Sequence, residues 1–279
     1  MNLMRLTSAG LRPINRGPGL VRGRLLWLVL GLTLTTACQT TTTGGFQASA
    51  DRAQALEDYI QLAVAYYDAN DMAGARRHIN NALAIDSRSS GAYNVLALVL
   101  QREGDLREAD QTFRRAISLD RTNSRVRNNY AAFLFSQMRY SEAFDQLRLV
   151  ADDVTYEGRG YAFENLGRSA LMLDRKPEAE QAFERALQLN GNLYISALEL
   201  TQLKLEKRDW PGARQAWAQY LTSREFFNVP FTARSLWIGI QVESQFQNTA
   251  QVEAYARILS MLFQDSPEYQ MLRNLADGN

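Results

Sequence analysis

Residues 56–89 read LEDYIQLAVAYYDANDMAGARRHINNALAIDSRS and residues 90–123 read SGAYNVLALVLQREGDLREADQTFRRAISLDRTN, so one pattern of residue types returns after 34 positions. The repeating positions are Tyr59, Leu62, Ala63, Tyr66, Ala75, Ile79 and Ala82 in the first stretch and Tyr93, Leu96, Ala97, Leu100, Ala109, Phe113 and Ala116 in the second. Apolar residues spaced three or four apart, in a repeat of this length, predict a pair of helices as the repeating unit.

The pattern continues through most of the remaining chain. It returns at Tyr130, Ala131, Leu134, Ala143, Leu147 and Val150, at Phe163, Leu166, Gly167, Ala170, Ala179, Phe183 and Ala186, and at Leu200, Ala213, Trp217 and Tyr220. Two extra residues interrupt the period between residues 152 and 158. Beyond residue 232 the pattern weakens, which is typical of a terminal unit that meets water on one side.

Two antiparallel helices that pack tightly need small residues where they touch and large residues around that contact. Tetratricopeptide repeats (TPRs) have this period and these positions. We therefore predict an all-α fold, a right-handed TPR superhelix (α-solenoid) of about six helix-turn-helix units. The predicted units lie near residues 56–89, 90–123, 124–158, 160–193, 194–227 and, in degenerate form, 232–265.

The first 50 residues differ from the rest. Arg22 and Arg24 precede an apolar run of about a dozen residues, the length of a signal-peptide core and shorter than the roughly 20 residues that span a bilayer. Ala37-Cys38 then resembles a bacterial lipobox, although Thr35 stands where leucine is usual. We predict a lipoprotein signal peptide over residues 1–37, and a lipidated Cys38 with a flexible tether over residues 38–50, ahead of an array over residues 51–279. The alternatives are an ordinary secreted protein with an incidental cysteine and an uncleaved anchor.

Composition excludes several classes of function. Without the five arginines of residues 1–37 the formal charge falls from +1 to −4, so nothing favours binding to nucleic acid. One cysteine and one histidine leave no intramolecular disulfide and no Cys/His metal site. Neither a phosphate-binding loop nor a nucleophile elbow occurs. His78 is expected to face solvent, and Glu178 and Glu180 to lie on solvated helix faces. We predict no enzyme, no cofactor, no metal and no small-molecule substrate.

The first helices of such units line a groove that binds a partner segment. No lysine precedes Lys176, which argues against a clamp for a terminal carboxylate. The groove of the first three units is partly apolar, which suits an amphipathic helix or strand. The predicted partner-binding residues are Ile60, Val64, Tyr67, Asn94, Leu98, Asn128 and Phe135. Alternatively, a short helix that starts within Asp51–Leu56 covers this surface.

Four segments carry a resemblance to a known family. They are Asn128-Asn129-Tyr130-Ala131-Ala132-Phe133-Leu134, Phe163-Glu164-Asn165-Leu166-Gly167, Ser235-Leu236-Trp237-Ile238-Gly239-Ile240 and Leu262-Phe263-Gln264-Asp265-Ser266-Pro267-Glu268-Tyr269. With the leader and the insert, they resemble the type IV pilus biogenesis/stability lipoproteins, the secretin pilotins of the PilF/PilW family. The chain departs from that family at Gln264, where proline is expected, and at Thr35.

The resemblance implies a lipid-anchored protein on the periplasmic face of the outer membrane, and Gln39 after the cysteine agrees with export there. Such proteins bind secretin subunits through their TPRs and promote outer-membrane localisation and multimerisation of the secretin, on which twitching motility depends. The remaining alternative is another TPR lipoprotein scaffold of the cell envelope, in outer-membrane protein assembly or a peptidoglycan-associated complex.

Overall fold

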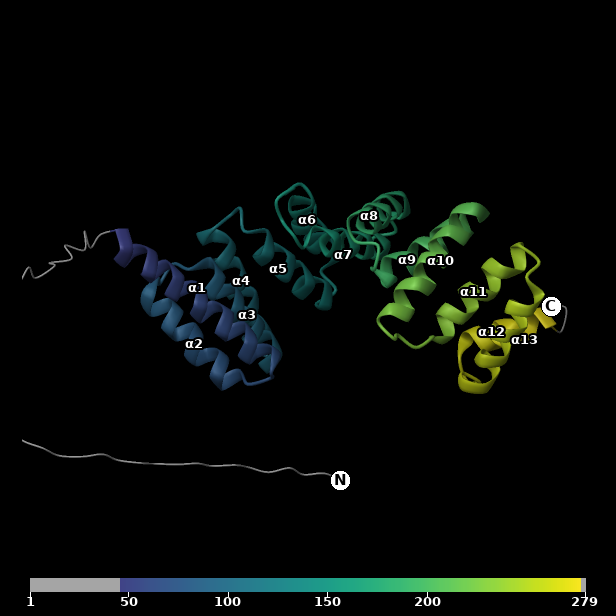
Figure 1. The fold of residues 1–279 in the computed structure, drawn as a ribbon, viewed down its shortest axis with the longest axis horizontal. Helices are drawn as coiled ribbons and strands as arrows, with labels where there is room; N and C mark the ends of the chain where they lie inside the picture. The colour runs from purple at the N-terminus through teal and green to yellow at the C-terminus, as the bar shows by residue number, and fades with distance from the viewer. Residues whose placement is uncertain (1–45, 277–279) are drawn as a thin grey trace, which may run out of the picture. The chain divides into compact units, whose positions relative to one another are not determined.

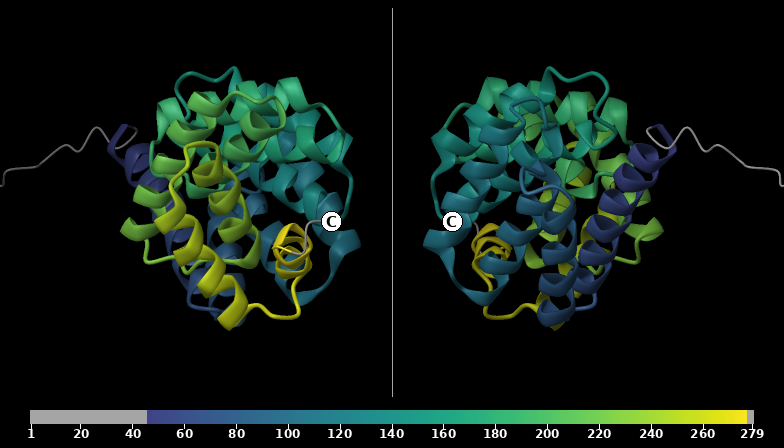
Figure 2. Two further views of the ribbon diagram at one scale, coloured as in Figure 1. Left: turned by 90° about the vertical axis from the view of Figure 1, so that its right-hand side faces the viewer. Right: turned by 90° about the vertical axis from the view of Figure 1, so that its left-hand side faces the viewer.

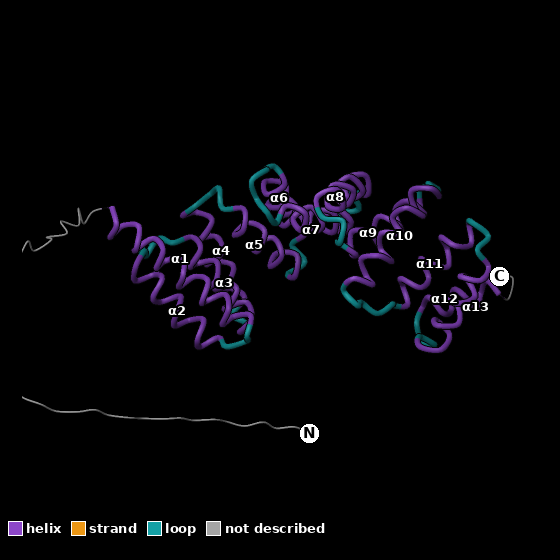
Figure 3. The backbone as a smooth tube through the Cα atoms, viewed as in Figure 1, coloured by secondary structure: helices purple, strands orange, loops and turns teal. Residues whose placement is uncertain are grey.

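The computed structural model describes residues 46–276. The predicted signal peptide, Cys38 and most of the predicted tether lie outside the described residues. Every regular element within residues 46–276 is an α-helix (Figures 1 and 3). The helices are α1 (Phe46–Asp68), α2 (Met72–Ile85), α3 (Ser90–Glu103), α4 (Leu106–Leu119), α5 (Ser124–Ser136), α6 (Tyr140–Ala151), α7 (Arg159–Met172), α8 (Lys176–Leu189), α9 (Tyr194–Glu206), α10 (Trp210–Phe226), α11 (Ala233–Gln245), α12 (Thr249–Leu262) and α13 (Pro267–Ala276).

The helices pack as successive pairs (Figures 1 and 2). The odd-numbered helix of each pair packs against its even-numbered partner, from α1 with α2 to α11 with α12. Each odd-numbered helix also contacts the next odd-numbered helix, from α1 with α3 to α11 with α13. The predicted all-α solenoid is therefore confirmed. No helix among residues 46–276 combines the length and the apolar character needed to cross a membrane.

Small residues lie where the helices of a pair touch. Ala75, Ala109, Ala143 and Ala179 are all completely buried in these contacts. At Gly167 the approach is closer still, since a Cβ atom there would lie 2.6 Å from the ring of Phe183. Large side chains fill the remaining space, and Trp217, which is 1% exposed and stacks on Tyr220, confirms the core packing expected for it. The repeated small and large positions thus hold each pair together by burial of apolar surface.

The turn inside each helix pair repeats one backbone conformation. One residue takes a left-handed conformation, with φ of 90° at Gly104, 58° at Met138 and 59° at Arg208. The next N–H donates to the carbonyl five residues earlier, for example from Arg139 to Leu134 at 2.9 Å. This bond is the Schellman arrangement that ends a helix and satisfies one of its last carbonyls. It reverses the chain within a few residues.

The turn between pairs relies on a side chain instead. Asp86, Asp120, Asp153 and Asn190 each accept a hydrogen bond from the backbone N–H two residues later, at 2.9, 2.9, 3.0 and 3.0 Å. Such Asx turns substitute a side-chain oxygen for a backbone acceptor. They follow α2, α4, α6 and α8 and direct the chain into the next pair, whereas α10 is followed by a left-handed turn at Asn228.

Both ends of the array differ from the expectations. Residues Asp51–Leu56 belong to the continuous helix α1, so the separate covering helix considered as an alternative is wrong. Leu62 is 43% exposed although its pattern position predicts burial, because no helix precedes α1 in the described chain to cover it. One period later, Leu96 packs against the core cluster of α1–α3. At the other end α13 is an additional helix that the period did not predict.

Two side chains expected at the solvated surface are packed instead. His78 is half-buried, and its ring stacks on Tyr66 and Tyr59 with centroids 4.9 and 6.0 Å away. Glu180 is 8% exposed and forms ion pairs with Lys204, at 2.8 Å, and with Lys207. The expected solvent-facing positions of these two residues are therefore wrong, whereas Glu178 is exposed as expected.

Candidate functional site

A cavity of about 640 Å³ opens between the odd-numbered helices α1, α3 and α5. Its fourth wall is the insert between α6 and α7, residues 153–158. Aliphatic side chains of α1, α3 and α5 form the apolar part of its lining, namely Ile60, Val64, Val95 and Val126. The volume falls in the range of about 300–1,000 Å³ that is usual for ligand sites.

The structure divides the seven predicted partner-binding residues into two groups. Ile60, Val64 and Asn94 line the cavity. Tyr67, Leu98, Asn128 and Phe135 lie elsewhere on α1, α3 and α5, outside its lining. Leu98 and Phe135 are partly buried and pack against the central core cluster, although Ile60 and Asn94 of the first group are buried more deeply.

Arginine side chains cover the two aromatic rings of the second group. The guanidinium carbon of Arg102 lies 3.7 Å from the ring centroid of Tyr67, and Arg102 also donates to the Tyr67 carbonyl at 2.8 Å. Arg168 covers the ring of Phe135 at 4.8 Å. These contacts are cation–π interactions, which stabilise an arginine over an aromatic face. This stretch of the predicted groove therefore presents cations and not bare apolar rings.

Asn94 is the most buried polar residue of the cavity lining, at 4% exposed. Its Oδ1 accepts a hydrogen bond from Nδ2 of Asn129 at 3.1 Å, which joins α3 to α5. Its own Nδ2 group makes no hydrogen bond within the described chain. This amide group is not among the buried atoms that lack a partner, so it reaches solvent and is free to donate to water or to an acceptor on an occupant of the cavity.

The insert is fixed to α5 through Asp153. One oxygen of this carboxylate accepts from the Ser124 hydroxyl at 2.6 Å, and the other from the Thr155 N–H and hydroxyl at 3.0 and 2.7 Å. The bonds from Ser124 and Thr155 hold the pKa of Asp153 below its usual value. Asp153 therefore stays charged at neutral pH and anchors this wall of the cavity.

Tyr156 supplies the aromatic surface of the insert. Its ring lies against the backbone of Gly158, where a Cβ atom would approach the ring within 2.6 Å. Burial raises the pKa of the Tyr156 hydroxyl, so the side chain stays neutral. The sequence located the insert but did not predict that Tyr156 and Glu157 border the same cavity as α1 and α3.

Four charged side chains of the lining form no ion pair with any described residue: Glu57, Arg125, Glu157 and Asp153, of which Asp153 is hydrogen-bonded to Ser124 and Thr155. Glu57 accepts only a long hydrogen bond of 3.3 Å from Gln61 on its own helix. The cavity thus combines aliphatic walls, one free amide donor and free charges of both signs, with acids in excess. This combination suits recognition of a peptide.

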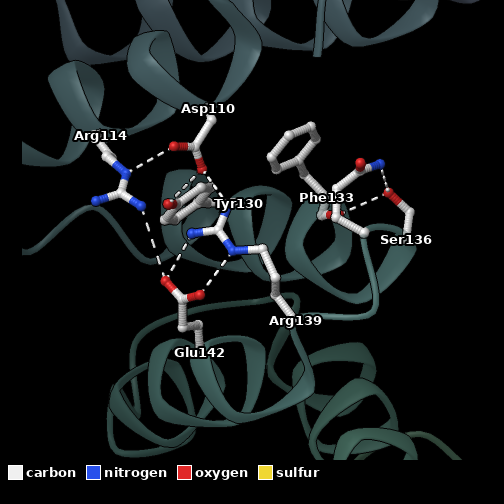
Figure 4. A network of polar contacts seen from close by, with 8 residues as sticks. Asp110, Arg114, Tyr130, Phe133, Ser136, Arg139 and Glu142 are labelled. Atoms are coloured by element: carbon white, nitrogen blue, oxygen red, sulfur yellow. Dashed lines mark hydrogen bonds and ion pairs between the residues drawn. The ribbon is translucent and has the colours of Figure 1, made fainter. Parts of the chain in front are cut away.

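A separate network holds α4, α5 and α6 together (Figure 4). Asp110 of α4 accepts hydrogen bonds from Tyr130 of α5 at 2.9 Å and from Arg139, just before α6, at 2.7 Å. Arg114 pairs with Asp110 at 2.9 Å, and Arg139 binds both oxygens of Glu142 at 2.7 Å. The network fixes the α5/α6 pair, which carries one wall of the cavity, against α4.

Among the described residues, no three His, Cys, Asp or Glu side chains come together as a metal site.

The profile of the tetratricopeptide repeat family matches residues 90–123, which cover α3 and α4. The chain is 35% identical over 219 residues to the type IV pilus assembly protein PilF of Pseudomonas aeruginosa, spanning 78% of this chain and 85% of that protein.

The chain belongs to the PilF family. The solved structure of Pseudomonas aeruginosa PilF superposes with a TM-score of 0.74 at 34% identity and covers 80% of this chain and 98% of that structure. The structure of PilW, a type IV pilus biogenesis factor, gives a TM-score of 0.62 at 24% identity, covering 78% and 98% of the two chains, and supports the fold alone. Similarity to PilF therefore extends through most of the described helices.

Proposed function

We propose that this chain is a pilotin of type IV pilus biogenesis, a lipoprotein that binds secretin subunits and promotes their localisation and multimerisation in the outer membrane. Membership of the PilF family carries this proposal, because 35% identity extends over 78% of the chain. The type IV pilus is a structure of the cell envelope, which agrees with the signal-peptide features of residues 1–37. A repeat scaffold with a peptide-sized cavity acts by binding, and we propose no catalytic step.

In this proposal Cys38 carries the lipid and holds the array at the periplasmic face of the outer membrane. The support comes from the sequence, in which the apolar run, Ala37-Cys38 and the polar tether follow one another. A single acyl chain binds membranes only reversibly, whereas several acyl chains on one cysteine give stable attachment. Cys38→Ser should release a folded array from the outer-membrane fraction. Full retention of the variant in that fraction would refute the anchor.

The proposed partner surface comprises the predicted residues Ile60, Val64, Tyr67, Asn94, Leu98, Asn128 and Phe135. Its support is the cavity between α1, α3 and α5, to which three of them contribute. Val64 is the aliphatic lining residue that keeps accessible surface, since Ile60, Val95 and Val126 are buried, and we expect Val64 to contribute more binding energy than the rings beneath Arg102 and Arg168.

The test is co-purification of the secretin with the unlipidated chain (Cys38→Ser) from a native envelope extract. Val64→Asp should abolish capture while thermal unfolding stays cooperative, because it places a charge on the aliphatic wall. Leu262→Asp is the matched control, since Leu262 is 70% exposed on α12. Recovery of outer-membrane assembly components in place of the secretin would refute the pilotin function. Undiminished capture by Val64→Asp would refute the site.

A further inference from the structure

A cavity is walled by α1, α3, α5 and residues 153–158. The polar residues of its lining restrict the chemistry of its occupant more than the apolar residues do. Resting on the proposed function, we propose that it binds an extended segment of the partner in which an aliphatic residue is flanked by lysine or arginine. Glu57 and Glu157 would contact the basic residues, and the Asn94 amide would donate to a backbone carbonyl. The insert is then part of the recognition site and not a passive spacer.

The first argument for a basic partner segment is the charge of the cavity lining. Glu57 and Glu157 line the cavity from α1 and from the insert, and neither forms an ion pair with a described residue. Several other acids of the array are paired, such as Glu103 with Arg76 and Glu199 with Arg234. Arg125 is the one cation of the lining, and with Asp153 the acids outnumber it three to one. Opposite charge on the partner would both accelerate the encounter and fix the register of the segment.

The second step is the conformation of the occupant. The Oδ1 atom of Asn94 is engaged by Asn129, which leaves the two Nδ2 hydrogens as the free groups of a side chain only 4% exposed. This amide group reaches solvent, and a ligand that displaces the water there must replace the acceptor. The carbonyls inside a helix are already bonded within the helix, whereas an extended segment presents free carbonyls. The amide of Asn94 therefore favours an extended segment over the helical alternative.

The third step is the side chain between the basic residues. Ile60, Val64, Val95 and Val126 line the cavity from three helices, and Val64 is the one of them that is not buried. Tyr156 lines the same cavity from the insert. An aliphatic side chain fits these walls without burying an unpaired polar group. The resulting recognition pattern is an aliphatic residue between basic residues, in an extended backbone.

The experiment uses the unlipidated chain (Cys38→Ser) and two arrays of immobilised peptides. One array tiles the periplasmic part of the secretin. The other is synthetic, with a central valine in a Ser/Gly peptide, flanked by lysine, by glutamate or by serine on both sides. The expected result is about tenfold stronger capture of the lysine-flanked peptides than of the glutamate-flanked ones at low salt, with the ratio decreasing as salt is added.

The decisive variant is the double substitution Glu57→Lys, Glu157→Lys. It removes no ion pair and should invert the preference toward the glutamate-flanked peptides. The matched control is Glu225→Lys, Glu253→Lys, which changes the net charge equally at two exposed acids of α10 and α12. The proposal is overturned if lysine-flanked and glutamate-flanked peptides are captured equally. It is also overturned if the preference survives in the first double variant, or is lost equally in the control.

Asn94→Asp tests the amide separately. The variant adds a negative charge, which by itself would favour lysine-flanked peptides, but it removes the donor. We expect at least a severalfold loss of capture of all peptides, with unchanged helical circular dichroism. Unchanged or stronger capture would overturn the role of Asn94.

The two arrays separate this inference from the proposed function. A lysine preference on the synthetic array with no capture of any secretin peptide supports the recognition pattern and refutes the secretin partnership. Capture of secretin peptides that is independent of their charge supports the partnership and overturns the recognition pattern.

Discussion

Asp110→Asn is the substitution that best tests how the cavity walls are held. Asp110 lies on α4 and receives three hydrogen bonds, from Tyr130, Arg114 and Arg139 (Figure 4). An asparagine keeps one acceptor oxygen but turns an amino group toward a guanidinium. The contact with Arg114 contributes little, because that side chain is 58% exposed.

Tyr130 and Arg139 both donate to Oδ1, which an asparagine can retain, so most of the expected loss comes from the change of their acceptor from charged to neutral. Tyr130 is only 4% exposed, and the side chain of Arg139 is 29% exposed. Hydrogen bonds to a charged group contribute about 1.5–3 kcal/mol when buried and less when partly exposed. We expect Asp110→Asn to lower the free energy of unfolding by about 2 kcal/mol at pH 7.

The pH dependence has a definite sign. Burial raises the pKa of Asp110, but the hydrogen bonds from Arg139 and Tyr130 outweigh it and leave the pKa below its ordinary value. A carboxylate with a lowered folded-state pKa stabilises the fold above its unfolded pKa of about 3.9, and this contribution disappears as the pH falls through the folded value. The difference between the native chain and the variant should therefore shrink below about pH 4.

Urea denaturation followed by far-ultraviolet circular dichroism measures both effects. Glu142→Gln is the control, because Glu142 contacts the same Arg139 but is 53% exposed, and its loss should be about 0.5 kcal/mol. A difference below about 0.5 kcal/mol for Asp110→Asn at pH 7 would refute this account, as would a difference that persists unchanged in acid.

Three further substitutions test the turns. Gly104→Ala should lower the free energy of unfolding by about 1 kcal/mol, because Gly104 has φ of 90° and no atom lies within 4 Å of the added Cβ, so the cost is backbone strain alone. Met138→Gly should raise it by about 0.5 kcal/mol, since Met138 has φ of 58° and its side chain is 76% exposed. Urea midpoints measure both, and effects of the opposite sign would show that the turns are unstrained. Gly158→Ala should displace the Tyr156 ring, because the added Cβ would meet it. We expect peptide capture to weaken severalfold while the urea midpoint stays unchanged. Unimpaired capture would exclude Tyr156 from the site.

The 34-residue period predicted the fold well because the two helices of each pair make the same packing contact. Ala75, Ala109, Ala143, Ala179 and Ala213 recur where two helices touch, and each is at most 1% exposed. The prediction failed where a residue depends on something other than its own pair. Leu62 is exposed because its partner would belong to a preceding pair, and α13 has no place in the period.

Contacts between neighbouring pairs follow the 34-residue period as well. Residues about one period apart face each other on adjacent odd-numbered helices. Asn129 bonds Asn94, and Arg102 bonds the carbonyl of Tyr67, each 35 residues apart along the chain. A search for arginines about 34 residues after an aromatic groove position would have predicted that Tyr67 and Phe135 are covered.

The insert shows why the site was harder to predict than the fold. After the turns at Asp86, Asp120 and Asn190, the next helix begins four residues later, at Ser90, Ser124 and Tyr194. After Asp153 it begins six residues later, at Arg159, although the same Asx turn is made. The two additional residues leave the packing of the pairs intact, so no pattern of apolar positions reports where they go. They allow Tyr156 and Glu157 to border a cavity whose other walls come from α1, α3 and α5.

A regular array presents an open groove along its odd-numbered helices. The insert walls one part of that groove and adds a carboxylate and an aromatic ring to its lining. The irregular part of the array is therefore where we expect selectivity for the partner to reside.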